Sequence, residues 1–134
     1  MIPAREDLVL AVGAAFGPES IIYTIKRSGL PLDLTACQVE MLGYGLQGGQ
    51  ALFSWKSQED KLTLGGAMGT VTPAVTGAET AAIWSTPGLI TRSLTPYRGM
   101  PTYLAGTWVM DISGPDGLFL RPLQGNLLLI PTFN

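Results

Sequence analysis

Hydrophobic residues occur along this chain in short runs that glycine and proline separate at close intervals. Runs of this length are typical of strands rather than helices. In the run 34–42, the residues Cys37, Val39 and Met41 alternate with polar ones, so one face of an extended chain is apolar and the other polar. On these grounds we predict strands at residues 7–12, 20–27, 34–42, 51–57, 61–66, 68–75, 106–113, 118–123 and 127–133.

Turn sequences separate the last of these strands. Residues 114–117 read Gly-Pro-Asp-Gly, in which proline presets one φ angle and Gly117 supplies a positive one. Residues 124–126, Gln-Gly-Asn, are interpreted as a second reversal. The apolar run that follows predicts a strand covered on both faces. Pro73 cannot donate a ladder hydrogen bond, so we expect the end of its strand to lie at a sheet edge.

The hydrophobic period changes at one place, residues 76–84. Thr76 and Glu79 have the spacing of a capping box, in which the threonine oxygen accepts from the amide of residue 79 and the glutamate accepts from the amide of residue 76. The apolar residues after them suffice for a short helix. We therefore predict one helix at 77–84, with Thr76 and Glu79 in structural roles.

Residues 86–104 are predicted to form a long loop, because they hold three prolines and show no sustained period. The segment has no acidic residue, and its arginine, tyrosine and methionine side chains are types enriched at interface centres. We interpret it as an assembly loop for an acidic or carbonyl-rich partner surface. The alternative is a mobile, exposed insertion. The residues assigned to the assembly interface are Arg92, Tyr97, Arg98, Met100 and Tyr103.

The composition excludes several kinds of chemistry. The 134 residues include no histidine and a single cysteine, Cys37. A Ser-His-Asp or Cys-His arrangement is therefore impossible within this chain, and so are an intramolecular disulfide and a multi-cysteine metal site. Cys37 lies on the apolar face of its predicted strand and is interpreted as a small buried hydrophobe. We expect no catalytic residue, no metal and no cofactor.

Charged residues are scarce, at 13% of the chain, against roughly 25% in an average soluble domain. A net charge of −2 provides no basic field for nucleic acid, and no apolar run is long enough for a helical membrane span. Residues 7–16 are interpreted as beginning with a strand rather than as a signal peptide, because Glu6 and Asp7 stand where a signal peptide is positive. We expect one domain over residues 1–134, with part of its surface buried against other subunits.

The acidic residues have structural interpretations. Asp33 precedes Thr35 at a turn, where its carboxylate can accept backbone amides. Asp116 belongs to the Pro-Asp-Gly turn. Asp111 has the opposite parity to the apolar residues of its strand, so we expect it to face solvent or to pair with Arg121 on the neighbouring strand. We therefore predict that no single acidic residue is catalytic.

Aromatic residues allow two interpretations. Tyr23, Tyr44, Phe53 and Trp55 could form a ligand-binding surface, but their strand periodicity favours the core. The residues expected to share the apolar face of the strand 106–113 are Trp108, Met110 and Ile112.

Several motifs, taken in order, resemble those of small tail-associated proteins of bacteriophages. The stretch SGLPLDLTACQVEM (28–41) is similar to their Gly-x-Pro-x-Asp-Leu-Thr-Gly pattern before a strand. The motifs that follow in the same order are KLTLGGAMGTVTPAVT (61–76), a helical TAA (80–82), AGTWVMDISGPDG (105–117) and LQGNLLLIPT (123–132). The chain departs from the family at Ala36, where glycine is usual, at Trp108, where tyrosine is common, and at 86–104, which resembles an insertion. The resemblance covers about residues 7–132.

The resemblance implies an immunoglobulin-like antiparallel β-sandwich, as in the N-terminal domain of phage upper-baseplate proteins, with Asp33 as a framework residue. It further implies a non-enzymatic virion protein, a tail, baseplate or fibre-attachment adaptor that is assembled in the host cytoplasm and packs against its own copies and other virion proteins. A capsid decoration or head-fibre protein is the first alternative. The second is a carbohydrate- or receptor-binding module that uses Trp55, Trp84, Tyr97 and Tyr103.

Overall fold

Strands account for most of the structure, a computed structural model that describes residues 3–17 and 21–131. The expected all-β class is confirmed, and α1 (Gly77–Trp84) is the one α-helix among the described residues. The strands are β1 (Ala4–Arg5), β2 (Leu8–Val12), β3 (Tyr23–Thr24), β4 (Lys26–Arg27), β5 (Leu30–Pro31), β6 (Gln38–Gly45), β7 (Ala51–Lys56), β8 (Leu62–Leu64), β9 (Thr70–Pro73), β10 (Arg92–Tyr97), β11 (Met100–Ser113) and β12 (Phe119–Pro131). Short 3-10 turns are η1 (Ser57–Glu59), η2 (Gly66–Met68) and η3 (Pro115–Gly117).

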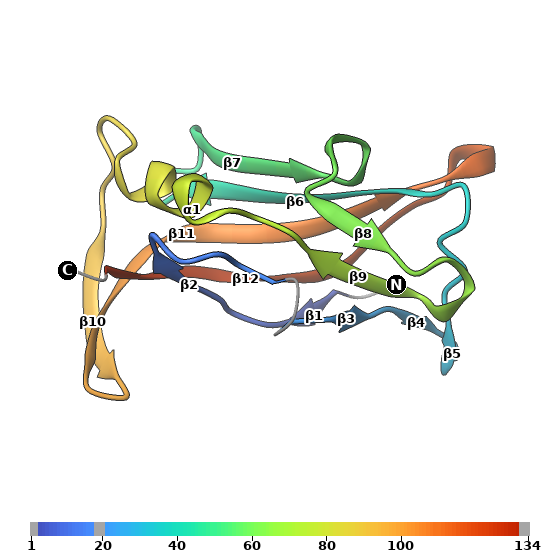
Figure 1. The fold of residues 1–134 in the computed structure, drawn as a ribbon, viewed down its shortest axis with the longest axis horizontal. Helices are drawn as coiled ribbons and strands as arrows, with labels where there is room; N and C mark the ends of the chain where they lie inside the picture. Colours follow the sequence, from blue (N-terminus) through green and yellow to red (C-terminus); the bar gives the residue numbers. More distant parts are fainter. Residues whose placement is uncertain (1–2, 18–20, 132–134) are drawn as a thin grey trace.

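The largest sheet has seven strands in the order β1-β12-β11-β6-β7, with β2 also paired to β12 and β10 to β11. Its long strands β11 and β12, of 14 and 13 residues, follow the long axis of the molecule (Figure 1). β1 and β2 lie parallel to β12, whereas the other pairs in this sheet are antiparallel. The expectation of a wholly antiparallel arrangement is wrong at this edge. Parallel pairing needs a long connection, and here nearly the whole chain separates the paired strands.

A second layer covers one face of this sheet. It consists of the three-stranded sheet β3-β9-β8 together with α1 (Figure 1), and the hydrophobic core lies between the two layers. Trp108, Met110 and Ile112 of β11 are fully buried in it, which confirms their predicted face. Each such side chain contributes about 1.5–3 kcal/mol when buried. Other members of the same core are Leu8, Leu10, Ile25, Leu62, Val71, Ile83, Leu127 and Leu129.

β12 is one continuous strand, so the prediction of two strands with a reversal at residues 124–126 is wrong. Gly125 lies opposite Trp108 in the ladder, and a Cβ atom there would lie 2.0 Å from the carbonyl oxygen of Glu6. The Trp108 Nε1–H donates to that same oxygen at 2.7 Å. Glycine is therefore required at position 125 because the backbone of Glu6, between β1 and β2, passes close to it. Glu6 is far away in sequence, and residue 125 forms no turn.

Residues 86–104 are also different from the predicted loop, because β10 and the first part of β11 form a hairpin. Arg98 and Gly99 make its turn with φ of 50° and 77°, and two positive φ angles are what a type I′ turn requires. Pro96 lies on β10, which pairs with β11 alone, and an edge strand tolerates the missing amide donor. The prolines led to the prediction of a loop, whereas an edge strand can accommodate a proline such as Pro96.

Several other predicted strands have different boundaries: β8 and β9 are shorter than the predicted 61–66 and 68–75, and β11 begins at Met100 rather than at residue 106. The strand predicted at 34–42 begins at Gln38, because residues 34–37 form a turn in which Ala36 has a φ of 66°. The strand predicted at 20–27 is divided into β3 and β4, and the Ile25 amide between them donates to the Gly69 carbonyl at 2.8 Å. Ser20 of that prediction, like residues 132–133 of the last predicted strand, lies outside the described residues.

Other turn predictions agree with the structure. Helix α1 has the predicted bounds and the predicted N-cap, Thr76. In the Pro-Asp-Gly turn Gly117 has a φ of 73°, and Asp116 is left-handed as well, with a φ of 60°. β9 is the middle strand of its sheet, but β3 pairs with it only at Thr70 and Val71, so Pro73 lies past the β3 pairing.

Candidate functional site at the hairpin end of the molecule

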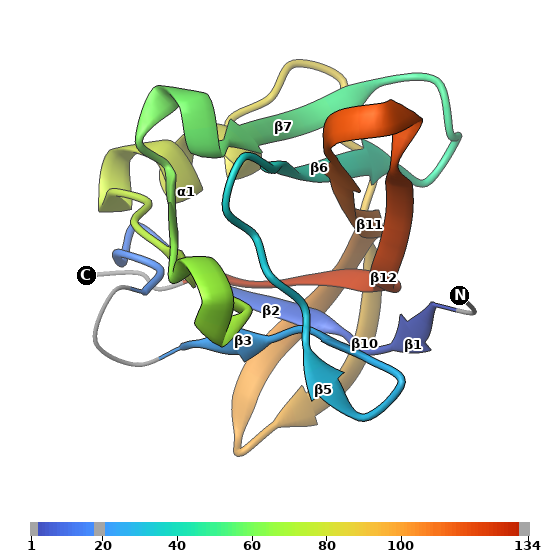
Figure 2. The same ribbon diagram turned by 90° about the vertical axis from the view of Figure 1, so that its right-hand side faces the viewer.

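The β10–β11 hairpin lies at one end of the long axis, at the left of Figure 1, and its turn extends beyond the body of the fold in both ribbon views (Figures 1 and 2). We call this the hairpin end. The end at the right of Figure 1, which carries β5, η2 and η3, is the opposite end. In the hairpin, the Thr102 hydroxyl donates to the Met100 carbonyl at 3.0 Å. The ladder and this bond make the predicted assembly segment an ordered hairpin.

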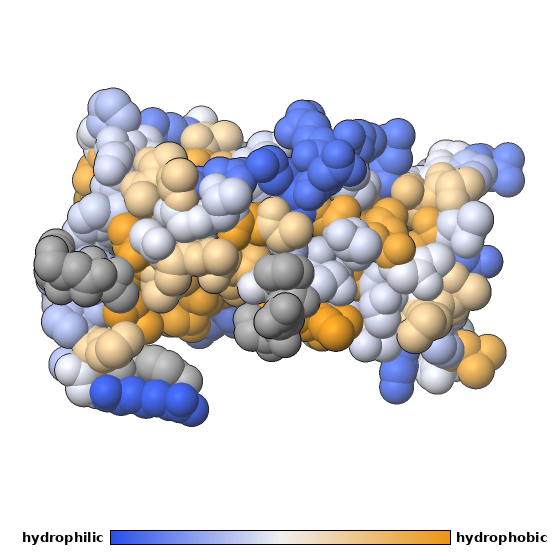
Figure 3. Space-filling model, viewed as in Figure 1, coloured by the Kyte–Doolittle hydropathy of each residue, from blue (hydrophilic) through white to orange (hydrophobic). Residues whose placement is uncertain are grey.

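The hairpin brings together the residues assigned to the assembly interface, although not on one face. Arg92, Arg98 and Met100 are exposed, whereas Tyr103 is half-buried at the base. The backbone of Tyr97 pairs with Met100, and its side chain lies outside what the structure describes. The far end of the hairpin is hydrophilic, as the blue atoms at the lower left of Figure 3 show.

The hairpin carries positive charge without acidic neighbours in sequence. Residues 80–110 contain Arg92 and Arg98 and no aspartate or glutamate. The nearest acid further along β11, Asp111, is held by Arg121, whose Nε and Nη2 donate to its carboxylate at 2.7 and 3.0 Å. The hairpin therefore carries two guanidinium groups, the side-chain type that binds carboxylate and carbonyl acceptors in two-pronged hydrogen bonds.

Helix α1 holds the base of the hairpin. Trp84, its last residue, packs against Tyr103 with ring centroids 5.5 Å apart and ring planes at 57°. The helix itself is fixed to the N-terminal segment, because the Thr80 hydroxyl donates to the Ala14 carbonyl at 2.8 Å and accepts from the Gly13 amide at 3.1 Å. The hairpin thus rests on an element that is anchored in the core.

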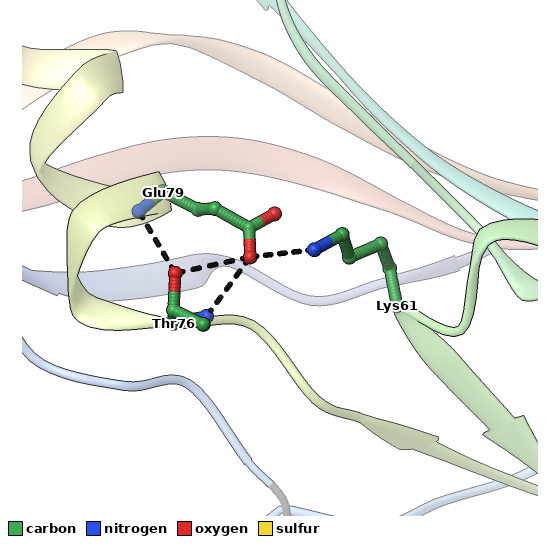
Figure 4. A network of polar contacts seen from close by, with 3 residues as sticks. All are labelled: Lys61, Thr76 and Glu79. Carbon is green, nitrogen blue, oxygen red and sulfur yellow. Dashed lines mark hydrogen bonds and ion pairs between the residues drawn. The ribbon is translucent and has the colours of Figure 1, made fainter.

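The N-terminus of α1 is closed by the predicted capping box (Figure 4). The Thr76 oxygen accepts from the Glu79 amide at 3.2 Å, and the Glu79 carboxylate accepts from the Thr76 amide at 3.3 Å. The Lys61 ammonium also donates to this carboxylate, at 2.7 Å. Partial burial opposes the ionisation of Glu79, but the hydrogen bonds from Lys61 and Thr76 outweigh it and lower the pKa of Glu79.

A hollow beside the hairpin was missed by the sequence analysis. It has a volume of about 200 Å³ and lies between the β6–β7 turn and the loop that leads from α1 to β10. Its lining contains no charged side chain. The signal in the sequence was the glycine-rich run 45–50, and the apolar residues opposite it belong to the predicted loop. The apolar lining residues are Leu46, Leu52, Leu89 and Ile90.

Charged side chains form a row on the outer face of the main sheet. Glu40 and Asp111 are direct ladder partners on β6 and β11. Each has its own cation, since Lys56 lies 3.8 Å from Glu40 and Arg121 lies 2.7 Å from Asp111. The predicted pairing of Asp111 with Arg121 is confirmed. The hydrogen bonds that Arg121 donates to Asp111 raise the pKa of the Arg121 guanidinium.

Asp33 lies at the opposite end from the hairpin and orders the turn before β6. Its carboxylate accepts from the Thr35 amide at 2.9 Å, as the sequence predicted. The hydrogen bonds from the Thr35 side chain and backbone lower the pKa of Asp33. Cys37 follows, half-buried, with its thiol directed to the Asp33 carbonyl. These contacts are those of a strand start.

The structure divides the aromatic residues of the proposed carbohydrate-binding module, because Trp84 and Tyr103 contact each other whereas Trp55 lies apart from them. Trp55 is buried in the core, where its ring stacks on Phe53 with centroids 4.0 Å apart. Trp84 lies instead at the base of the hairpin. Tyr23 packs against Trp108, and burial, followed by the charge of Glu6, raises the pKa of its hydroxyl. Phe53 and Trp55 are therefore core residues, as their periodicity favoured.

No protein-family model matches this chain, and no curated protein matches it in sequence. Within residues 3–17 and 21–131, no three cysteine, aspartate or glutamate side chains are grouped to hold a metal ion. In the same residues no helix has the length and apolar character to cross a membrane. The features that remain for a functional interpretation are the hairpin, the neutral hollow at its base and the exposed apolar residues.

Proposed function

We propose that this protein is a non-enzymatic structural protein of a bacteriophage virion, a tail, baseplate or fibre-attachment adaptor that works by packing against its own copies and other virion proteins. One observation carries the proposal. The β10–β11 hairpin extends from the body of the fold and presents Arg92, Arg98 and Met100 to solvent. An ordered arm with cationic and apolar side chains is suited to contact with a second protein.

The fold is consistent with this role. Two β-layers enclose one core, and we propose that the arrangement is a variant of the immunoglobulin-like sandwich in which β1 and β2 add parallel strands along β12. The low charge content of 13% suits a surface that is partly covered by neighbours. The motif order along the chain is the source of the phage assignment.

The test replaces the hairpin side chains without disturbing its backbone. The variant combines Arg92→Gln, Arg98→Asn and Met100→Thr, because asparagine tolerates the positive φ of residue 98. A matched control, Glu59→Gln with Asp60→Asn, removes two exposed charges on η1 and its cap. The hairpin variant and the control variant each replace the wild-type protein while particles are produced. The number of copies of the protein per particle is then measured by quantitative mass spectrometry. We expect at least a tenfold loss for the hairpin variant and none for the control. Normal incorporation of both would refute the role of the hairpin.

Two alternatives make different predictions. A capsid decoration or head-fibre protein would place a tagged copy on the head when particles are imaged, whereas an adaptor places it on the tail. The contact between Trp84 and Tyr103 supports a glycan-binding module, since both rings are partly exposed. A glycan titration that changes the fluorescence of the wild type but not of Trp84→Phe would favour that module over the assembly role.

A further inference from the structure

A second hollow lies on the outer face of the main sheet, and we call it the outer hollow. It has a volume of about 210 Å³. Gln38, Ser113 and Phe119 are ladder partners on β6, β11 and β12 and form one row of its lining. Glu40 and Asp111, two positions away along β6 and β11, form the next row on the same face. The register of the sheet therefore gathers an aromatic ring, an amide, a hydroxyl and two carboxylates at one place.

The backbone around the outer hollow is fixed. Two residues of β12, Arg121 and Pro122, lie opposite the single residue Asp111 of β11, which is a β-bulge. Bulges bend a strand and redirect its side chains, and Arg121 on this bulge donates to both oxygens of Asp111. On the other side, η1 is held to β6 because the Val39 amide donates to the Ser57 hydroxyl at 3.0 Å. Little order therefore has to be gained when a ligand binds.

The charges at the outer hollow balance one another. The Lys56 ammonium lies 3.8 Å from the Glu40 carboxylate, and the Arg121 guanidinium lies 2.7 Å from the carboxylate of Asp111. A charged ligand would be attracted by one member of each pair and repelled by the other at nearly the same distance. The outer hollow is therefore suited to a neutral ligand.

Polar groups at the outer hollow retain hydrogen-bonding capacity. Among residues 3–17 and 21–131, the side chains of Gln38 and Ser113 have no hydrogen-bond partner. The Glu40 carboxylate uses only one oxygen, Oε2, which accepts from the Ser54 hydroxyl at 2.6 Å. Amides and hydroxyls both donate and accept, whereas a carboxylate accepts. A ligand rich in hydroxyl groups, which also donate and accept, matches this set.

Phe119 adds an apolar surface to these polar groups. Its side chain is 61% exposed, and the face of an aromatic ring is electron-rich, so it attracts the weakly positive C–H groups of a ligand. A sugar ring combines a face of C–H groups with hydroxyls around its edge. The outer hollow is smaller than the roughly 300–1,000 Å³ of sites for drug-sized ligands, so it is suited to a single such ring.

An extended peptide is less suited to this place. Peptides that bind to sheets add a strand at a free edge, whereas β6 lies between β7 and β11, and β11 lies between β6 and β12. The backbone groups of these central strands are already used in the ladders. The outer hollow therefore recognises a ligand through side chains alone.

We infer that the outer hollow binds a neutral saccharide, one ring of which stacks on Phe119 while its hydroxyls bond to Gln38, Ser113 and Glu40. The site is separate from the contact between Trp84 and Tyr103 at the base of the hairpin. The inference goes beyond the proposed assembly function and does not depend on it.

The test separates the ring of Phe119 from its apolar character. Phe119→Leu removes the ring and keeps an apolar side chain, whereas Phe119→Tyr keeps the ring. Gln38→Ala removes the amide, and its matched control is Gln47→Ala, an exposed glutamine at the hairpin end. Trp84→Phe is the control for the other aromatic contact. Circular dichroism and thermal unfolding establish that each variant is folded, as expected for exposed positions.

The wild type is first applied to an array of immobilised neutral, sialylated and sulfated oligosaccharides, and the neutral glycan bound most strongly is then titrated by calorimetry. We expect Phe119→Leu and Gln38→Ala each to raise its Kd by about fivefold or more. Phe119→Tyr, Gln47→Ala and Trp84→Phe should bind as the wild type does. In ¹⁵N spectra, the titration should also shift the side-chain amide signal that is missing from Gln38→Ala.

Four results would overturn the inference. They are an array on which no neutral glycan binds, binding confined to the acidic glycans, an unchanged Kd in Phe119→Leu, and a loss of binding in Trp84→Phe. The last of these would place the sugar at the base of the hairpin instead.

A failure of this inference is distinguishable from a failure of the proposed function. Phe119→Leu should enter particles at the normal copy number, and the hairpin variant should bind the glycan with the Kd of the wild type. Glycan binding with normal incorporation of the hairpin variant would retain the inference and reject the role of the hairpin. Loss of incorporation of the hairpin variant without glycan binding by the wild type would do the reverse.

Discussion

β11 has two halves with the same backbone and different surroundings. From Gly106 to Ser113 the strand is paired on both edges, with β6 and β12, and Met110 is 0% exposed. From Met100 to Leu104 the strand belongs to the hairpin, and Met100 is 42% exposed. Ladder pairing is maintained in both halves. β12 pairs with the outer half only at Tyr103 and Leu104, so the comparison teaches that β10 alone is enough to hold the tip, Met100 to Thr102, as a strand, which leaves the side chain of Met100 exposed for contacts.

The inner half should be the most sensitive to truncation. Met110→Ala removes a fully buried side chain and should lower the free energy of unfolding by about 2–5 kcal/mol through lost burial and a cavity. Urea unfolding followed by tryptophan fluorescence measures this. A loss below about 1 kcal/mol would mean that the core at Met110 can collapse around the gap, and the contrast between the halves would fail.

Gly125→Ala should destabilise the protein at β12, the strand that pairs with the inner half of β11. The new Cβ would lie 2.0 Å from the Glu6 carbonyl oxygen, so the β1–β2 junction must move away from β12. We expect a loss of about 1–3 kcal/mol, the usual cost of overpacking. Gly49→Ala is the matched control, because nothing lies within 4 Å of a Cβ there. Equal stability of the two variants would contradict the structural role of Gly125.

The capping box supports the base of the outer half, and its contribution should depend on pH. Thr76→Ala should cost about 1 kcal/mol at pH 7. The pKa of Glu79 is lowered in the folded protein, so its stabilising contribution is complete above its ordinary pKa of 4.5 and is lost as pH falls through the lower folded value. The stability difference between wild type and Glu79→Gln should therefore be constant above pH 4.5 and shrink below it. A difference that grows towards acid pH would contradict this prediction.

Met100→Ala should have the smallest effect, within about 0.5 kcal/mol of wild type, because the side chain is already exposed. It is the matched partner of Met110→Ala, the same substitution on the same strand. The same urea titration measures both. A loss comparable to that of Met110→Ala would show that the hairpin side chains contribute to folding rather than to contacts.

The sequence predicted best where the determinants are local. The alternation of Trp108, Met110 and Ile112 identified a buried face, and the Thr76 and Glu79 spacing identified the helix start. The Gln-Gly-Asn segment was wrongly predicted to be a reversal. Glycine is needed at position 125 because the backbone of Glu6 lies against it, and no local sequence pattern reveals that contact. In the candidate site, the residues proposed for the interface were assigned to a loop but lie on a hairpin, since prolines on an edge strand give the sequence a loop-like composition.

The neutral hollow could not be predicted for a related reason. Its two sides, the 45–50 turn and the loop at Leu89 and Ile90, come from segments about forty residues apart in sequence. Neither has a motif of its own. Their juxtaposition follows from the way β10 continues along the edge of β11 where β6 ends.

The parallel pairing of β2 with β12 has a consequence for synthesis of the chain. The Asp7 carboxylate accepts from the Asn126 amide, across 119 positions of sequence. During translation, Leu8 and Leu10 are made long before their ladder partners on β12, so their strand has no partner there until more than a hundred further residues have been added. Contacts of such high order slow folding and prolong exposure to aggregation. The main sheet is therefore completed only once β12 has been synthesised, and a nascent chain lacking β12 has no ladder partner for β2 and none on that edge of β11.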